Sequence, residues 1–425
     1  MRIIADSKNS EEFLASAITK RRVIADLQIH SKHARATSKD LSIANLEKYA
    51  RMKGVDLLGV GDFQHPLHRK EIDAELKEDE KGILYSKTGF PFLWQTEVSL
   101  MFSQGGKRRA VHLLIFAPRR EIADKITAYL GSKGRLDYDG RPIFGISCRN
   151  LVKDLKEIDD GIEIISAHCM TPWFGLFGSD SGFDSLKECF EDQVDKIYAV
   201  ESGMSADPSM LWRLKENVNI VSFSDAHSFW PWRLGREATI FEISELSYED
   251  IMKAMRTGAG IIATIETPPE YGKYHWDGHR NCNFSCSPAE TRKLNGLCPI
   301  CKKSLTIGVE YRIEQIAKEK EGYKPENAKD FYKILPLHEL IALAKESTLA
   351  SKKTWALYNE FIQKFGNEFN ILLDVSENDL LKAFPKETLV VELIMEGRKG
   401  KLRVKPGFDG EYGKVLLPEK QGKLF

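Results

Sequence analysis

Short apolar segments alternate with amphipathic segments from Val23 to about Glu266, and this alternation restricts the choice of fold more than any other feature. The apolar segments have the length and residue types of strands, and the amphipathic ones have helical spacing, several ending in a Gly suited to a helix stop. Strands that alternate with helices predict βα units and a mainly parallel, barrel-like sheet. The predicted strands are residues 23–30, 55–63, 92–100, 109–117, 162–168, 196–203, 219–227 and 260–266, and the predicted helices include 42–54, 121–131, 149–159 and 247–258.

The chain has 425 residues, which is too long for one ordinary core and predicts one large domain with smaller ones. We expect an N-terminal extension (1–22), an α/β barrel (23–266), a small Cys- and His-bearing module (267–304) and a mainly helical region with a basic, Gly-rich tail (305–425). Helices are expected around 337–346 and 354–369. These boundaries follow from changes in composition along the chain.

The charges give no global electropositive field, because 62 basic residues balance 62 acidic ones. Binding to nucleic acid would therefore need a local patch. Residues 397–425 carry eight Lys and Arg against three Asp and Glu, which makes this tail either a nucleic-acid contact or a solvated end. No apolar window is long enough to cross a membrane and the N-terminus is too charged for a signal peptide, so we expect a cytoplasmic protein with no membrane partner.

Polar residues recur at the ends of the predicted strands. In a parallel barrel these ends meet at one mouth, where such folds place their chemistry. Any one of these residues alone is more simply a hydrogen-bonded structural residue, but several buried together need compensation, which bound cations supply. Imidazole with carboxylate suits zinc, manganese or iron. The residues are His30, Asp62, Glu97, His168, Glu201, Asp225 and His227, with His112 on a further strand.

These motifs also carry a resemblance. The segments DLQIHS, GVGDF, TEVSL, SAH and SDAH resemble the successive motifs of the PHP (polymerase and histidinol phosphatase) phosphoesterases. Longer segments resemble the endonuclease Q group within that superfamily, among them RATSKD, GDFQHP, AHCMTPWFGLFGSDSGFDSLKECF, YAVESGMSADP, SDAHSFWPWRLGREA, YHWDGHRNC and PGFDGEYG. The resemblance implies a distorted (βα)7 barrel with two or three divalent ions, and Mg²⁺ or Mn²⁺ as candidates for catalysis.

The resemblance further implies a DNA-repair endonuclease that hydrolyses the phosphodiester 5′ to uracil, hypoxanthine, xanthine or abasic sites. Double- or single-stranded DNA with such damage would be the partner, and a sliding clamp or another repair protein is a partner class that the sequence leaves open. Two or more metals would generate a hydroxide and neutralise the phosphodiester oxygens. We keep two rivals, which are a phosphoesterase for a small phosphate monoester and a noncatalytic DNA-binding protein with a degenerate metal site.

Carried over motif by motif, the family pattern assigns ligands and catalytic groups. It implies a first metal on His30, Glu97 and Asp225, and a second on Glu97, His112 and His168. It places His227 at a third site near Asp62, so that the expected catalytic residues are Asp225, Asp62 and His227. The chain departs from the pattern at Gln28, where the family has His and where an amide oxygen is a weaker ligand. Phe63 also replaces a usual His, for which His65 is a candidate substitute.

The segment TPWFGLFG, residues 171–178, is aromatic and Gly-rich beside His168. Aromatic side chains can stack on a base that has been flipped out of a duplex. The resemblance favours a substrate-binding role for Trp173, Phe174, Phe177 and Gly178. From composition alone, these aromatic residues would be assigned to the core.

The Cys-rich module has the spacing of a zinc site. Cys298 and Cys301 form a CxxC knuckle, and His279 and Cys282 have the same spacing earlier in the chain. The predicted ligands are Cys282, Cys298 and Cys301, with His279 or Cys286 as the fourth. A closed, thiolate-rich site stabilises a fold and does not catalyse. A redox dithiol is the alternative, but the thioredoxin-like context that it requires is missing.

Overall fold

Two β-sheets form the centre of the protein in the computed structural model, which describes residues 20–417. Apart from the last three residues, the predicted N-terminal extension lies outside this range. The larger sheet has the strand order β16 (Asp330–Lys333), β13 (Ile261–Glu266), β12 (Ala238–Ile243), β1 (Arg21–Asp26), β2 (Leu57–Gly59), β5 (Pro91–Leu93), β4 (Ile83–Ser86) and β3 (Leu76–Glu78). The second has the order β11 (Asn219–Val221), β10 (Ala199–Glu201), β9 (Glu163–Ser166), β7 (Lys107–Phe116), β6 (Gln95–Gln104) and β8 (Ile143–Phe144).

The α/β class is confirmed, but the closed, mainly parallel barrel is not. Both sheets are mixed, since β1 pairs parallel with β2 and antiparallel with β12. The largest departure is the hairpin of β6 and β7, which pair antiparallel over ten residues each. Its turn is Gly105 and Gly106, both with positive φ (60° and 73°). A Gly-Gly pair between strands favours such a tight hairpin turn, and we missed this signal in the sequence.

The helices begin and end where their capping residues place them. In α1 (Ile43–Lys53) the Ser42 side chain accepts a hydrogen bond from the backbone N–H of Asn45, and Gly54 ends the helix with φ 91°. In α7 (Tyr248–Thr257), Ser247 and Gly258 do the same. A serine N-cap satisfies an otherwise unpaired N–H, and glycine enters the left-handed region without a steric penalty. Both boundaries therefore agree with the sequence expectation.

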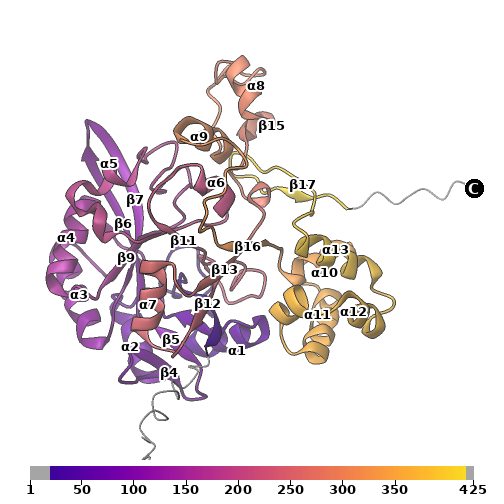
Figure 1. Cartoon of the computed structure of the whole chain (residues 1–425), viewed down its shortest axis with the longest axis horizontal. Coiled ribbons are helices and arrows are strands. Elements are labelled where there is room, and N and C mark those ends of the chain that lie inside the picture. Colours follow the sequence, from indigo (N-terminus) through magenta and orange to yellow (C-terminus); the bar gives the residue numbers. More distant parts are fainter. Residues whose placement is uncertain (1–19, 418–425) are drawn as a thin grey trace, which may run out of the picture.

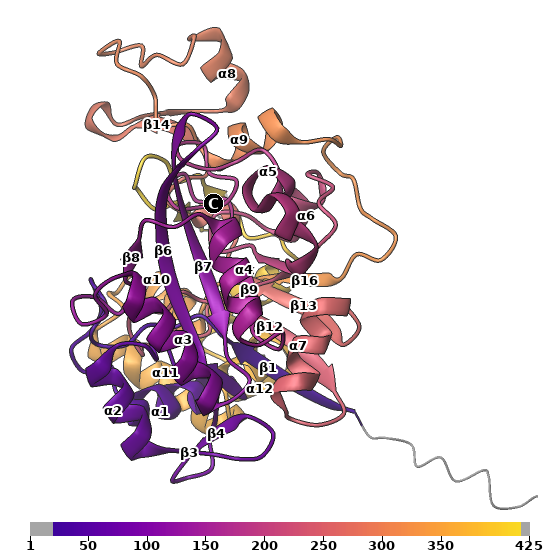
Figure 2. The same cartoon turned by 90° about the vertical axis from the view of Figure 1, so that its left-hand side faces the viewer.

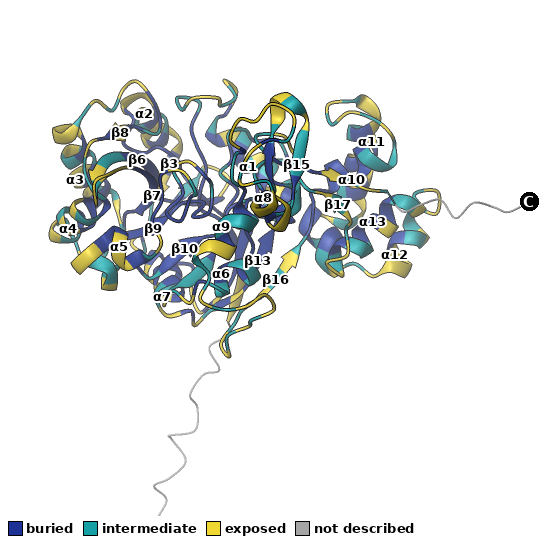
Figure 3. Ribbon diagram, turned by 90° about the horizontal axis from the view of Figure 1, so that it is seen from above, coloured by how far each residue is buried: buried dark blue, intermediate teal, exposed yellow. Residues whose placement is uncertain are grey.

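The remaining helices of residues 20–266 lie around the two sheets (Figure 1, Figure 2). They show buried inner and exposed outer sides (Figure 3), as expected for amphipathic helices. In α4, for example, Leu151, Val152 and Leu155 are buried while Lys153 is exposed. These helices are α2 (Pro66–Glu75), α3 (Arg120–Lys133), α4 (Cys148–Ile158), α5 (Leu186–Phe190) and α6 (Pro208–Trp212).

Strand β1 shows how the sequence pattern positions polar groups inside the protein. Val23 and Ala25 pack in one apolar cluster and Ile24 in another, so successive side chains face opposite sides. The strand ends at Asp26, but the chain stays extended, and the backbone N–H of His30 donates to the carbonyl of Ala226 at 3.0 Å. Gln28 and His30 therefore face the same side of the extended chain as Asp26, toward the site described below.

The Cys-rich module projects from the top of the molecule in Figure 1. It contains the short hairpin of β14 (Asp277–His279) and β15 (Phe284–Cys286), followed by α8 (Pro288–Lys293). Helix α9 (Val309–Ile316) and strand β16 lead from it to the helical region, and β16 pairs with β13 of the larger sheet. No helix within residues 20–417 is long and apolar enough to cross a membrane.

The C-terminal helices α10 to α13 are attached to the larger sheet region by a buried ion pair. The Lys53 ammonium of α1 lies 2.6 Å from Glu368 Oε1 and donates to the Pro231 carbonyl at 2.8 Å. Tyr358 donates to the second oxygen of Glu368 at 2.9 Å. Removing one partner would leave a buried charge uncompensated. The helices are α10 (Leu337–Ala344), α11 (Lys352–Phe365), α12 (Glu377–Ala383) and α13 (Thr388–Arg398); the tail follows with β17 (Val404–Lys405) and β18 (Lys414–Val415).

Candidate metal centre and base pocket

Glu97, on β6, is the centre of the first cluster of potential metal ligands. Its Oε1 lies 2.6 Å from His112 Nδ1 and 3.5 Å from His168 Nε2. All three residues are buried, and their ligand atoms lie within 4.8 Å of one another. Burial lowers the pKa of His112 to about 3, against the opposing effect of Glu97, so the ring is neutral and able to donate a lone pair to a metal. The set of two imidazoles and one carboxylate fits a divalent transition metal.

His30, Asp225 and His227 form a second cluster next to the first. The Nε2 of His30 lies 3.1 Å from Asp225 Oδ1 and 3.0 Å from Glu97 Oε2, so the carboxylate of Glu97 faces both clusters. The rings of His30 and His227 lie 4.6 Å apart between centroids. Glu97 is therefore placed to bridge two ions.

Asp62 and His65 lie outside both clusters. Asp62 Oδ1 lies 3.0 Å from His30 Nδ1, and Asp62 Oδ2 accepts the backbone N–H of Ser31 at 2.6 Å. A carboxylate on the far nitrogen of a ligand histidine fixes its tautomer and orientation. His65 stacks on His33 at 4.5 Å and joins no ligand group in the described chain. The structure thus places Asp62 behind His30 and does not bring His65 to the metal centre.

Three of these residues have a backbone conformation that is rare outside glycine. The φ angles are 39° at Asp62, 28° at His168 and 48° at Asp225. In the case of His168, the backbone N–H donates to the buried carboxylate of Glu201. Such conformations cost of order 1–3 kcal/mol each and concentrate at functional sites. Their coincidence with the predicted ligands supports a functional role for this centre.

Gln28 occupies the position at which the family motif has His, and its side chain faces Glu97. Gln28 Nε2 donates to Glu97 Oε2 at 2.9 Å, while Gln28 Oε1 is buried without a hydrogen-bond partner. Arg141, which the sequence analysis missed, lies 3.2 Å from the other oxygen of Glu97. Burial raises the pKa of Glu97, but Arg141 and His112 outweigh that effect and hold it well below its usual range. Glu97 is therefore ionised.

A cavity of about 480 Å³ opens beside these ligands. His112, His168, Asp225 and His227 line it together with Trp173 and Phe174 of the predicted substrate loop. Phe174 stacks on His112 at 4.4 Å, and Trp173 is 41% exposed. The structure does not bring Phe177 and Gly178 to this cavity. Phe177 is buried in the core, and Gly178 packs against the backbone of residues 171 and 172.

Other lining residues come from parts of the chain that sequence reasoning did not connect with the site. The cations are Arg141, Arg236 and Lys273, and the aromatic residues include Tyr274 and Tyr412. Lys273 lies over the ring of Tyr412 at 4.7 Å. Tyr412 lies in PGFDGEYG, a segment that the resemblance had already singled out, so a signal for it existed. Arg236 likewise lies in SDAHSFWPWRLGREA, another segment of the resemblance, whereas Arg141 follows no pattern that would have identified it.

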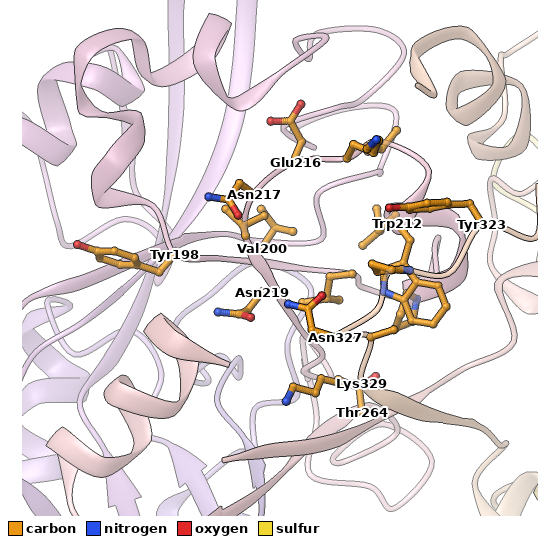
Figure 4. Close-up of a pocket in the computed structure, with 18 of the residues that line it drawn as sticks. Tyr198, Val200, Trp212, Glu216, Asn217, Asn219, Thr264, Tyr323, Asn327 and Lys329 are labelled. Atoms are coloured by element: carbon orange, nitrogen blue, oxygen red, sulfur yellow. The ribbon is translucent and has the colours of Figure 1, made fainter. Parts of the chain in front are cut away.

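A second cavity of about 490 Å³ lies away from both ligand clusters. Tyr198, Trp212, Glu216 and Tyr323 are among its lining residues, and Figure 4 shows Tyr198 apart from Trp212 and Tyr323, which lie close to each other. None of the residues of the ligand clusters lines it. We therefore assign the chemistry to the first cavity.

The Cys-rich module brings four predicted ligands together. The ligand atoms of His279, Cys282, Cys298 and Cys301 lie within 4.8 Å of one another. Cys286 is not part of this group, and its sulfur lies 3.2 Å from the hydroxyl of Thr291. The proximity of these atoms favours His279 as the fourth ligand, and a set of one imidazole and three thiols has the composition of a structural zinc site.

Comparison with known proteins identifies relatives of this chain. A family model described as the MJ0043 C-terminal domain matches residues 336–401, which include α10 to α13. The uncharacterized protein MJ0043 of Methanocaldococcus jannaschii is 36% identical over 299 residues, 68% of this chain and 35% of that protein. The chain thus spans about a third of the length of this relative.

Two solved structures match nearly the whole chain with a TM-score of 0.84 and 30% identity. One is PfuEndoQ of Pyrococcus furiosus, described as a novel lesion-specific endonuclease, with 94% of this chain and 96% of that chain covered. The other is endonuclease Q in complex with a 27-mer duplex that has an abasic lesion at the active site, with 94% and 97% covered. Identity and coverage at this level over both chains show that this chain belongs to the endonuclease Q family.

Proposed function

We propose that this chain is a metal-dependent DNA-repair endonuclease that cuts the phosphodiester on the 5′ side of a damaged nucleotide. The proposed lesions are deaminated bases, namely uracil, hypoxanthine and xanthine, and abasic sites. The observation that carries the proposal is the match over nearly the whole chain to endonuclease Q bound to an abasic duplex. The histidine and carboxylate clusters at the cavity, one fully buried and one partly exposed, support the hydrolytic part of the proposal.

The residues of both clusters fit divalent ions. Glu97, His112 and His168 would hold one ion, and His30 and Asp225 would hold another, with Glu97 between them and His227 close by. Bound there, such ions would generate a hydroxide near neutral pH and neutralise the oxygens of the phosphodiester. We assign Asp225 to orienting the attacking water as well as to ligation. Asp62 holds His30 in position.

The cavity residues would hold the nucleotide on either side of the scissile bond. Arg141, Arg236 and Lys273 provide positive charge for the phosphate backbone. Trp173 and Tyr274 contact each other edge to face at 5.3 Å and offer surfaces on which an extruded base can stack. This arrangement suits a flipped-out nucleotide, which chemistry at a lesion within a duplex requires.

The remaining parts of the chain would hold the duplex. We assign residues 23–266 to the catalytic part, 267–304 to a zinc finger stabilised by His279 and three cysteines, and 305–425 to the helical and basic part. Asp409 of the C-terminal segment accepts hydrogen bonds from the Arg280 backbone and the Thr306 hydroxyl, each at 2.7 Å. The tail is thus fixed against the zinc finger beside the cavity. A large substrate needs this extended surface, and a small phosphate monoester does not.

The test is a strand-cleavage assay with labelled duplexes that carry one hypoxanthine, one uracil or one abasic site, in Mn²⁺ or Mg²⁺. We expect a nick immediately 5′ to the lesion and its loss in Asp225→Asn, which keeps a side chain that tolerates the positive φ of this position. Asp192→Asn, an exposed carboxylate paired with Arg149, is the matched control and should cut normally. Lesion binding without cutting by the wild type would contradict the proposal and favour a degenerate metal site around Gln28.

A further inference from the structure

The second cavity, of about 490 Å³, lies where the two sheets end, and the proposed chemistry gives it no role. Its lining includes Asn219 and Ile220 on β11, the last strand of the smaller sheet, and Asp330 on β16, the last strand of the larger one. Its volume is that of an ordinary small-molecule pocket. In the described part of the chain, its lining and the two clusters around Glu97 have no residue in common, so an inference about this cavity goes beyond the proposed function.

A long connection forms one wall of this cavity. Residues 317–329 join α9 to β16 without a helix or strand, and connections of this length are uncommon and often functional. The start of the connection is fixed, since two of its backbone N–H groups donate to the Arg213 carbonyl at 2.8 and 3.0 Å. Further along, Tyr323 and Asn327 line the cavity. The connection therefore borders the cavity and does not fill it.

The lining offers one uncompensated positive charge. Lys329 is half-buried, and its ammonium group forms no ion pair or hydrogen bond within residues 20–417. Every other charged lining residue is paired. The pairs are Lys215–Glu319 at 2.8 Å, Glu216–Lys318 at 2.9 Å, Arg256–Glu163 at 2.6 Å and Asp330–Lys324 at 4.0 Å. The free charge therefore favours an anionic ligand, and phosphate is a common partner of lysine.

The neutral lining residues have the chemistry to bind a heteroaromatic base. Trp212 and Tyr323, which lie close to each other in Figure 4, present aromatic rings on which any base can stack. The side-chain amides of Asn217 and Asn327 form no hydrogen bond within the described chain, and each has donors and an acceptor for the edge of a base. The Thr264 hydroxyl is buried at this cavity without a hydrogen-bond partner among the described residues. Buried polar atoms are rarely left unpaired, so this orphaned hydroxyl points to a ligand.

We propose that this cavity is a second binding site, which takes a nucleoside 5′-phosphate with its base against Trp212 and its phosphate on Lys329. This chemistry has two sources, a free mononucleotide and a nucleotide within a single strand of DNA. The site binds the nucleotide without cutting it, because the proposed metal ligands line the other cavity.

Calorimetric titration of the full chain with adenosine 5′-monophosphate (AMP) and with adenosine tests the two contacts separately. Lys329→Gln should weaken the binding of AMP by roughly 10-fold, the loss typical of a hydrogen bond to a charged group, and that of adenosine by less than about twofold. Trp212→Leu should weaken the binding of both ligands by roughly 10-fold, because both carry the base. AMP that binds to the metal clusters through its phosphate would not respond to either variant.

Lys253→Gln is the matched control. Lys253 is an exposed lysine of α7 that does not line the cavity, so its replacement should leave both affinities unchanged. The absence of saturable AMP binding would overturn the proposal. An unchanged AMP affinity in Lys329→Gln, or an equal loss of AMP and adenosine binding in that variant, would also overturn it. Strand cleavage is measured separately, so a failure of the proposed function does not alter this outcome.

A competition experiment with the wild type identifies the source of the ligand. Displacement of bound AMP by a short oligodeoxyadenylate would support the proposal and assign the site to a nucleotide within a DNA strand. Retention of AMP in the presence of the oligonucleotide would support the proposal and assign the site to a free mononucleotide.

Discussion

The two groups of potential metal ligands differ in how the chain builds them. The clusters around Glu97 take their residues from strands and strand ends distant in sequence, and the same part of the chain contains two large apolar cores. The proposed zinc finger takes its four potential ligands from residues 279–301, and in the described part of the chain its own buried core consists of Cys286, Cys298 and Leu305. We therefore expect the fold to hold the first site, and a bound metal to hold the fold of the second.

Chelation offers the largest test of this difference. We expect mild EDTA treatment to abolish cutting while the zinc finger keeps its metal, because structural zinc sites bind with about 10–16 kcal/mol. Added Mn²⁺ should restore cutting, since the surrounding sheets hold the empty ligands in place. Parallel loss of zinc content and activity, followed in one titration, would show that the two sites are not distinct in this way.

Substitution of a zinc ligand tests whether the Cys-rich module needs its metal to fold. Cys298→Ser should release the zinc and unfold the finger, with new proteolytic cleavage between residues 273 and 306 and little change in the sheets. Cys286→Ser is the control, because Cys286 lies outside the ligand group and should keep its zinc. Mass spectrometry measures the zinc content of both variants. Loss of zinc from Cys286→Ser alone would assign the fourth ligand to Cys286.

A smaller effect is expected at Gln28. Its N–H donates to Glu97 Oε2, and its own oxygen has no partner, so the side chain competes for a ligand atom without contributing a strong one. Gln28→His should lower the Mn²⁺ concentration that supports half-maximal cutting by roughly 10-fold. Gln28→Leu removes the hydrogen bond without adding a ligand and serves as the control. Weaker metal use by Gln28→His would indicate that the amide is adapted to this site.

A further effect, which concerns folding and not cutting, is expected in the dependence of stability on pH. The pKa of Glu237 is raised from its ordinary value near 4.5 to about 7, so its favourable contribution is complete below pH 4.5 and is lost as the pH rises through 7. The wild type should therefore lose stability relative to Glu237→Gln across this interval, by about 3 kcal/mol at most. The zinc finger has the opposite dependence, because acid protonates its thiolates. Urea unfolding from pH 5 to 8 tests this, and a constant difference would contradict it.

The sequence predicted the parts of the site that lie on regular elements. The alternation in residues 23–30 placed Gln28 and His30 on the same side as Asp26, and the Cys and His spacing located the zinc finger. The Gly105-Gly106 pair is a sequence signal for the hairpin of β6 and β7, and the prediction of a mainly parallel barrel did not take it into account. Arg141 and Glu237 lie in irregular segments, where no periodicity reports which way a side chain points. Only tertiary structure brings them to the cavity.

The left-handed backbone at Asp62, His168 and Asp225 has a consequence for any attempt to make this protein more durable. Glycine at His168 relieves the steric cost of that conformation in the folded state, against a smaller loss from the greater freedom of the unfolded chain. Selection for thermal resistance would therefore favour mutation of His168, a proposed metal ligand. Variants selected by heat treatment without an activity screen are expected to lose proposed metal ligands early. Thermal stability and catalysis would then act as opposing selective pressures in this molecule.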